Sequence, residues 1–466
     1  MIAAKTPREL TFADVTADTG PTGLRVEGTI PDWLHGSFVR NGSARYSFGP
    51  VELRHWFDGM AFLQRFAFSN SQVNYTSRFI RSDSYRAALE GRAEYQSFAT
   101  PAARSLSSWL AGLALSNLTD NTNVNVVRYG ESCVALTEVG LPRCFDPQTL
   151  DTLAPLKFND DLGLGPTTAH PVRCGDAWVN YTLKLGLHNE YVVWRMSANG
   201  AREVLARIPS KRPAYVHSIG ASARYAVLIE YPYRFDPIAM LLQAKPFIEN
   251  FQWNGGESLI HLIHLKGEAA PVTCAAEPFF CFHHVSTFDD GDSVVIDLVG
   301  YDDASIVTDL YLDRVCETAP AAPGLSLRRY RAPLNGQDAD RQTLLNARIE
   351  LPRVDVRAER PRYVYAPRMG VGESFTDGIL QIDTASAAQR VWERPDESPG
   401  EAIFVPKPGS TGETDGVVLF VALNAREQRS ALVVLDAATF EERARAWAPA
   451  MLPIGFHGQF WSATER

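Results

Sequence analysis

The sequence Phe-Phe-Cys-Phe-His-His-Val-Ser-Thr-Phe-Asp-Asp-Gly-Asp-Ser-Val-Val-Ile-Asp-Leu-Val-Gly-Tyr runs from Phe279 to Tyr301 and indicates the fold of the whole chain. Apolar and aromatic residues flank an Asp-Asp-Gly-Asp turn at 289–292, where Asp-Gly supplies the positive φ that a hairpin turn needs. His283 and His284 are therefore expected on a strand, where successive side chains point to opposite faces. One imidazole can face the interior, either as a hydrogen-bonded core residue or as a metal ligand.

Short strands separated by turn residues recur through most of the chain. They predict an antiparallel meander and not nucleotide-binding βαβ units. Many short strands with few long helical patterns favour an all-β fold, a β-propeller of four-stranded blades, although no WD or kelch repeat is visible. A propeller accommodates residues 1–466 as one domain, where length alone would suggest about three. The expected strands include Leu24–Ile30, Gly36–Arg40, His55–Met60, Ala61–Phe68, Val124–Tyr129, Cys133–Thr137, Ala177–Lys184, Tyr191–Met196, Tyr225–Glu230, Val294–Val299, Gly378–Ile382, Gly416–Leu423 and Ser430–Leu435.

Charge and composition narrow the function. The formal net charge of −9 and the lack of a basic block argue against nucleic-acid binding, which needs clustered Lys and Arg. Residues 1–10 lack an apolar core of signal-peptide length, and no later run reaches the roughly 18 apolar residues of a membrane span, so we expect a cytoplasmic protein. The cysteines show no CxxC or zinc-type spacing, and we expect buried free thiols at Cys133, Cys144, Cys174, Cys274, Cys281 and Cys316.

Two apolar stretches interrupt the strand pattern. Ser105–Leu118 is uncharged and rich in Leu and Ala, and Ile238–Phe251 contains several large apolar residues. Either stretch could be a core helix. A short apolar helix with an interfacial Trp109 would equally suit shallow insertion into a bilayer.

Four histidines lie far apart in the sequence, three of them after strand-like runs. The inner strand of each propeller blade lines a common axis, so sequence distance does not keep these residues apart. Four imidazoles on this axis would form a neutral nitrogen site suited to a transition metal. No HxxxH or HExxH signature places two of them on one element, so their spacing alone is weak evidence. They are His170, His217, His283 and His457.

Six segments, in order and spread over nearly the whole chain, closely resemble the carotenoid cleavage oxygenase family. They are His55–Met60 (His-Trp-Phe-Asp-Gly-Met), Ala135–Glu138 (Ala-Leu-Thr-Glu), Thr168–Pro171 (Thr-Ala-His-Pro), Phe282–Val285 (Phe-His-His-Val), Glu401–Pro406 (Glu-Ala-Ile-Phe-Val-Pro) and Gly455–Phe460 (Gly-Phe-His-Gly-Gln-Phe).

The resemblance implies a seven-bladed propeller with Fe(II) on its axis, held by the four histidines, and it selects His283 over His284. It also implies three glutamates behind the ligands, because a carboxylate that accepts the Nδ1 proton fixes the tautomer and orientation of each ring. Short helices and loops at about 80–120 and 236–252 are expected to cap the active-site face and admit the substrate. The implied glutamates are Glu138, Glu350 and Glu401.

The implied reaction is cleavage of a conjugated carbon–carbon double bond with O₂ as co-substrate. Four ligands around a metal that prefers six leave two adjacent positions open for O₂ activation beside an organic substrate. A carotenoid or apocarotenoid would need a tunnel of flat apolar side chains, and the residues expected to line it are Phe456, Phe282, Tyr301, Thr137 and Thr122.

Three other readings remain open. Stilbene-cleaving relatives typically carry Lys just before the glutamate that matches Glu138, where this chain has Thr137. Retinoid isomerohydrolases share the four-histidine iron but do not cleave with oxygen, and Thr122 matches a threonine that oxygenases of the family often keep. A metal-free propeller that serves as a binding scaffold is the alternative from another class. Relatives dock on membranes through an apolar patch, which favours peripheral membrane contact by residues 105–118; the sequence does not indicate an oligomeric state.

Overall fold

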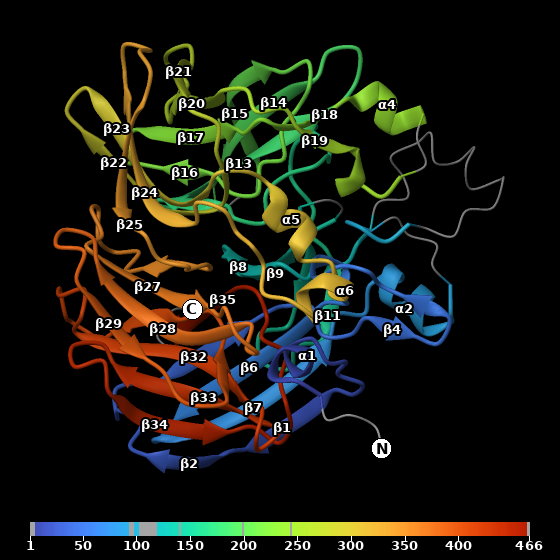
Figure 1. Cartoon of the computed structure of the whole chain (residues 1–466), viewed down its shortest axis with the longest axis vertical. Helices are drawn as coiled ribbons and strands as arrows, with labels where there is room; N and C mark the ends of the chain where they lie inside the picture. The colour runs from blue at the N-terminus through green and yellow to red at the C-terminus, as the bar shows by residue number, and fades with distance from the viewer. Residues whose placement is uncertain are drawn as a thin grey trace.

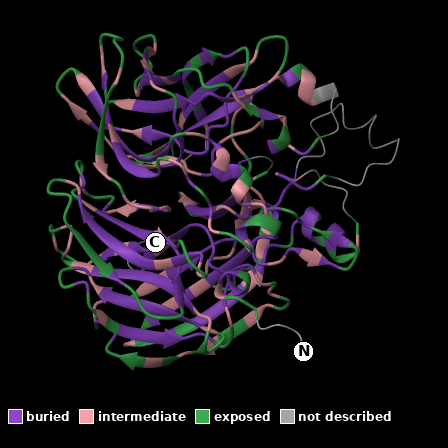
Figure 2. Cartoon of the chain, viewed as in Figure 1, coloured by how far each residue is buried: buried purple, intermediate pink, exposed green. Residues whose placement is uncertain are grey.

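Seven antiparallel sheets form the blades of a β-propeller in the part of the chain that the computed structural model describes, residues 5–92, 97–101, 119–138, 141–197, 200–242 and 245–463 (Figure 1). The expectation of an all-β, seven-bladed propeller is thus confirmed. Successive side chains point to opposite faces of a strand, and the central strands β23, β32 and β33 are buried at nearly every position because both faces of their sheets pack against neighbours. Figure 2 shows buried positions along the strands and exposed ones at the loops.

Five blades are built from consecutive stretches of chain. They are β8–β11 (Asn125–Tyr129, Ser132–Leu136, Arg143–Phe145, Thr152–Pro155), β12–β15 (Val172–Cys174, Ala177–Lys184, Glu190–Met196, Arg202–Pro209), β16, β17, β20 and β21 (Gly220–Ala221, Tyr225–Glu230, Ser258–His264, Val272–Ala276), β22–β25 (Phe280–Asp290, Ser293–Tyr301, Ser326–Pro333, Asp340–Leu345) and β26–β29 (Arg353–Val354, Tyr363–Met369, Thr376–Asp383, Gln389–Trp392).

The two remaining blades join both ends of the chain. One pairs β1 (Thr19–Gly23), β7 (Gln72–Phe79), β6 (Phe62–Ser69) and β3 (Gly36–Arg40) with β35 (Gly458–Ser462). The other contains β30 (Glu397–Pro399), β31 (Ile403–Pro406), β32 (Gly416–Asn424), β33 (Arg429–Asp436) and β34 (Glu442–Trp447), and ends on β2 (Arg25–Gly28). Figure 1 shows the blue strands beside the red ones at this closure.

Short helices gather on one side of the propeller, at the right of Figure 1. They are α2 (Asp83–Leu89), α4 (Pro237–Leu242), α5 (Ser305–Asp309) and α6 (Leu312–Val315); α1 (Pro7–Thr11), the 3₁₀ turns η1 (Trp56–Asp58) and η3 (Ile248–Asn250), and the strand pairs β4–β5 (Ser47–Phe48, Val51–Glu52) and β18–β19 (Tyr233–Phe235, Phe251–Trp253) complete the described elements. No helix among the described residues is long and apolar enough to cross a membrane.

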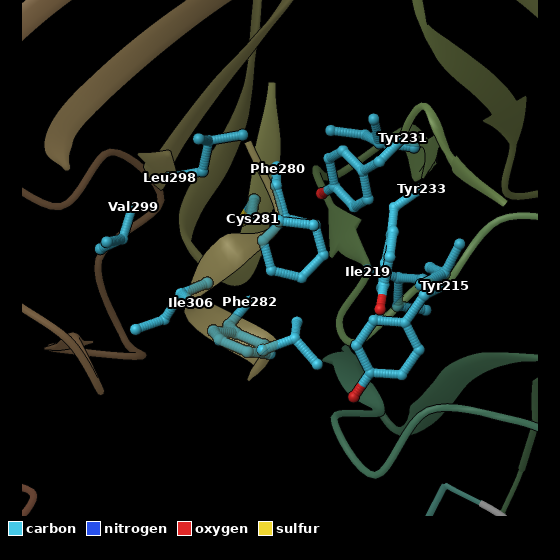
Figure 3. Packing of buried hydrophobic residues seen from close by; sticks show 14 of the residues in the cluster. Tyr215, Ile219, Tyr231, Tyr233, Phe280, Cys281, Phe282, Leu298, Val299 and Ile306 are labelled. Atoms are coloured by element: carbon cyan, nitrogen blue, oxygen red, sulfur yellow. The ribbon is translucent and has the colours of Figure 1, made fainter. Parts of the chain in front are cut away.

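The hairpin at 279–301 forms as predicted, with its loop shifted by one residue. Asp290 pairs with Ser293, so the loop is Gly291-Asp292, and Gly291 adopts φ 63°. Inside the blade Phe280 and Phe282 pack beside Tyr215, Tyr233 and Ile306 (Figure 3). This packing anchors the strand that carries the histidine pair.

Three expectations from the sequence need correction or completion. His55–Met60 is not a strand, because the His55 side chain caps a 3₁₀ turn by accepting a hydrogen bond from the Phe57 N–H. Ile238–Phe251 is not one helix but contains most of α4, then η3 and the first residue of β19. Cys133, Cys274 and Cys281 are buried free thiols, whereas Cys144, Cys174 and Cys316 are only half-buried. The stretch 105–118 lies outside the described residues.

Candidate metal centre

Four histidine side chains converge from four different blades. One ring nitrogen of each lies within 4.8 Å of those of the others, with 3.1 Å between the Nε2 atoms of His170 and His217 and 3.2 Å between those of His283 and His457. Each histidine lies in, or up to three residues before, a strand at the edge of its sheet: β12, β16, β22 and β35 respectively. These edge strands face the propeller axis, which brings residues far apart in sequence to one point.

A β-bulge aims His283 at this point. In the pairing of β22 with β23 the register shifts between Cys281 and His284, and again between His284 and Ser286. A bulge bends a strand locally and re-aims the side chains around it. His284 points away, and its Nδ1 lies 2.8 Å from the Ser218 hydroxyl. The structure therefore places His283, and not its neighbour, in the cluster.

Carboxylates contact the outer nitrogens of three of the four rings. The Nδ1 atoms of His217 and His283 each lie 2.5 Å from a glutamate oxygen, and that of His457 lies 2.8 Å from one. A carboxylate at Nδ1 holds the proton there and leaves the Nε2 lone pair free for a metal. The glutamates, in the same order, are Glu138, Glu350 and Glu401.

A further layer of polar groups holds these carboxylates. The hydroxyl of Tyr215 donates to Glu138 at 2.8 Å, and that of Tyr301 donates to Glu350 at 2.5 Å. Glu401 instead accepts from the Gly458 N–H at 2.7 Å and lies 3.7 Å from the Arg353 guanidinium. Each carboxylate thus has both a histidine and a second group that fixes its plane.

His170 is the exception among the four. It is only half-buried, and no carboxylate pairs with it among the described residues. Its backbone N–H donates to the Thr168 hydroxyl at 2.9 Å, and that hydroxyl donates to the His217 carbonyl. Backbone contacts, and not a carboxylate, place this ring.

The electrostatics of the site favour neutral imidazoles and ionised carboxylates. Burial and the neighbouring imidazoles hold the pKa of His170 well below its usual range, and burial lowers the pKa of His457 to about 4. Burial works against ionisation of Glu350 and Glu401, but His283 beside the first and Arg353 with His457 beside the second lower their pKa values. Neutral nitrogen donors backed by anions suit a divalent transition metal, so the residues present fit such an ion.

A cavity of about 1050 Å³, counted out to its open mouth, lies against the cluster. Its wall is largely aromatic: the rings of Phe57 and Phe456 lie 5.4 Å apart, and Phe57 lies 5.8 Å from Phe282. Of the residues expected to line a tunnel, Phe456, Phe282, Tyr301 and Thr137 do so. His217, His283 and His457 border the same space.

Thr122 is not part of the described wall. It is fully buried between Asn121 and Asn123, which do line the cavity. Both asparagine amides donate to the Gly59 carbonyl, at 2.9 and 2.8 Å, so they point to the same side and the residue between them does not share it.

Several wall residues were not singled out from the sequence. Trp56 and Phe57 belong to a motif quoted above without an assigned role, Phe98 lies in the described segment 97–101, and Phe247 directly precedes η3. Tyr215 lies two residues before His217, a spacing that puts both on one side of an extended segment and could have indicated their shared carboxylate.

The fold and the site define a β-propeller with an axial cluster of four imidazoles that opens into an aromatic cavity. A family model described as retinal pigment epithelial membrane protein (RPE65) matches residues 12–462. The chain therefore belongs to this family, the carotenoid cleavage oxygenases, as the motifs predicted.

Named relatives extend this finding over the full chain. It is 28% identical to rat beta,beta-carotene 15,15'-dioxygenase, over 96% of this chain and 91% of the relative. It is 30% identical to carotenoid cleavage dioxygenase 8 homolog A, chloroplastic, of rice, over 95% and 85%. A mutant of Synechocystis apocarotenoid oxygenase superposes with a TM-score of 0.87 at 23% identity, covering 99% of this chain and all of the other, which shows the same fold.

Proposed function

We propose that this chain is an Fe(II)-dependent dioxygenase that cleaves one conjugated carbon–carbon double bond of a carotenoid or apocarotenoid, with O₂, into two aldehyde or ketone products. The observation that carries the proposal is the four-histidine cluster opening into an aromatic cavity. The names of the rat and rice relatives support the reaction type.

His170, His217, His283 and His457 would hold the iron, each through the nitrogen that faces the cluster. When bound, the metal would supply the binding and activation of O₂ beside the substrate. Glu138, Glu350 and Glu401 would keep the Nδ1 protons of His217, His283 and His457 in place, so that these three rings remain neutral donors in fixed directions.

The cavity wall would bind and orient the polyene. Flat rings such as Phe282 and Phe456 offer area without hydrogen-bonding groups, and they exclude water from the space beside the cluster. No lysine or arginine lines the cavity within the described residues, so no cation there would hold a phenolic oxygen. A polyene is therefore favoured over a stilbene-type phenolic.

Parallel incubations test the proposal. Protein loaded with Fe(II) is incubated aerobically with an apocarotenoid and with a hydroxystilbene, and the carbonyl products are identified by mass. We expect two fragments from the apocarotenoid, and no fragments and no bound iron with His217→Ala. Cleavage of the stilbene alone would reverse the substrate ranking. A purified protein without iron, whose properties His217→Ala does not change, would support the metal-free scaffold.

We also propose that the protein is cytoplasmic and docks peripherally on a membrane through residues 105–118, with segments near 80–120 and 236–252 forming the cap that admits the substrate. Ser97, Phe98 and Phe247 of these segments border the cavity, and Ile238 on α4 is 71% exposed. Trp109→Ser with Leu110→Ser should raise the soluble fraction without removing iron. Leu187→Ser, at a fully exposed leucine between β13 and β14, is the control. Unchanged partitioning would count against the docking.

A further inference from the structure

The turn Arg54–Met60 holds no metal, yet it contacts three segments that cover the cavity. Its first contact is with α5 and α6. The Nε2–H of His55 donates to the Val307 carbonyl at 2.8 Å, and the Trp56 N–H donates to the Leu310 carbonyl at 3.2 Å. This part of the turn therefore fixes the short helices over one side of the cavity.

The second contact runs through the carboxylate of Asp58. One oxygen accepts from the Ala99 N–H at 3.0 Å, and the other accepts from the Thr100 hydroxyl at 2.6 Å. The Arg54 N–H also donates to that hydroxyl, at 2.8 Å. Asp58 thus holds the segment 97–100 from both of its oxygens.

The burial of the Asp58 carboxylate costs free energy, and no basic side chain among the described residues offsets this cost. The residue is 2% exposed, and no lysine or arginine pairs with it within the described ranges. A buried carboxylate without a cation lowers stability unless hydrogen bonds compensate, and burial raises the pKa of Asp58. Next to it, a Cβ on Gly59 would come within 2.5 Å of the Tyr46 ring, so the backbone packs here too closely for any residue with a side chain.

The third contact is made by residues 119–123. The Asn121 and Asn123 amides donate to the carbonyls of Gly59 and Phe57, and the Ala61 N–H donates to Asn121 at 2.8 Å. The turn is thereby held from the side opposite to 97–100.

Phe57, in the middle of the turn, connects the cap to the metal centre. Its ring lies 5.3 Å from Phe98, which follows Ser97 on the segment that Asp58 holds. On its other side it lies 6.1 Å from the His217 ring, at 23°. A shift of the segment 97–100 would therefore move the wall directly above the cluster.

We propose that Asp58 is a positioning residue: by holding Ala99 and Thr100 it fixes Phe98 against Phe57, and so decides which double bond of a polyene lies over the metal centre. The inference deepens the proposed function and rests on it. Asp58 also borders the cavity, but in this role it acts through the two phenylalanine rings.

Three variants test this role on the full, iron-loaded chain. Asp58→Ala removes both bonds to residues 99 and 100, and Asp58→Asn keeps one acceptor. Thr100→Val keeps the shape of the side chain and removes the bond to Asp58 together with the one from the Arg54 N–H. Asp383→Asn is the matched control, because Asp383 is also buried and accepts from Arg362 instead. The readouts are bound iron, kcat and KM on an apocarotenoid, and the ratio of products cleaved at neighbouring double bonds.

We expect full iron content in all variants, kcat/KM about tenfold lower for Asp58→Ala, and a mixture of cleavage products, with Thr100→Val intermediate and Asp58→Asn partly restored. Asp383→Asn should give the single wild-type product. Wild-type product ratios in both Asp58→Ala and Thr100→Val would overturn the inference. If the wild-type chain cleaves no apocarotenoid, the proposed function fails. Anaerobic binding of the apocarotenoid then tests the positioning role by itself. Equal affinity of wild type and Thr100→Val, or no binding by either, overturns that role as well.

Discussion

The metal centre and the aromatic wall above it are ordered by different forces. At the centre three imidazoles are backed by carboxylates, and these by a phenol or a guanidinium, so hydrogen bonds fix the direction of each atom. In the wall, the Phe57 ring packs against the rings of Phe98 and Phe456. The hydrogen bonds that position these rings are made by the backbone and by neighbouring side chains, not by the rings themselves. We therefore infer that reactivity and substrate choice depend on separate residues. Substitutions should separate them.

The largest effect is expected at the cluster. His283→Ala should reduce bound iron to background and lower turnover more than about 100-fold, beyond the range seen when only an outer partner of a metal ligand is lost. His284→Ala is the control on the same strand, and we expect it to keep its iron. Iron analysis and product formation measure both. Equal iron loss in the two variants would show that the bulge does not select His283.

Lowering the pH should destabilise the folded protein by protonating His55, which packs behind the aromatic wall. Its Nδ1 accepts from the Phe57 N–H, and its ring lies between Phe57, Phe98 and Tyr311; burial lowers its pKa from 6.5 to about 4. Between these values the unfolded chain binds a proton that the folded one does not, so stability falls as pH falls, by about 3 kcal/mol for this group.

Denaturant unfolding of the metal-free protein at several pH values checks this expectation. His55→Gln should lose that share of the pH dependence while the rest of the profile is unchanged. Parallel profiles for wild type and variant would contradict the assignment.

A smaller effect is expected from the glutamates that contact the histidine rings. Glu350→Gln or Glu401→Gln should weaken iron binding by about tenfold, because the amide no longer holds the Nδ1 proton by charge. Glu230→Gln is a matched control: Glu230 is buried and lies 3.2 Å from His261, in a pair away from the cluster. Competition with a chelator measures the affinities. Equal weakening by Glu230→Gln would indicate a general loss of stability.

The smallest effect is expected from a single ring of the wall. Phe456→Leu should raise KM for an apocarotenoid about fivefold and leave bound iron unchanged, since one aromatic contact contributes about 1 kcal/mol. Steady-state kinetics together with iron analysis separate the two quantities. Loss of iron in this variant would mean that the wall and the centre are not independent.

Much of the propeller could be predicted from the sequence, because strand patterns are local. Ala177–Lys184 and Tyr225–Glu230 were expected with the bounds that the structure gives them. The strand expected at His55–Met60 was wrong, because a hydrogen bond to the His55 side chain caps a 3₁₀ turn there. That bond could not be read from apolar spacing.

The site was less predictable, because it depends on register and on distant pairing. Alternation along β22 allows one histidine to face inward, but the bulge that selects it has no sequence signal here. Thr122 lies outside the described cavity wall, because the hydrogen bonds of Asn121 and Asn123 to the Gly59 carbonyl turn those two side chains, and not Thr122, to that side. The cap contacts of Asp58 link residues some forty positions apart in an irregular region.

The pairing of β35 with β3 has a consequence for how the protein assembles. His457 directly precedes Gly458, which pairs with Arg40 near the other end of the chain. Pairing two segments so far apart in the sequence costs chain entropy. The His457 imidazole reaches the propeller axis only when β35 has paired with β3. A bound metal would thus link β35 to the other blades, and its departure would weaken the pairing of β35 with β3.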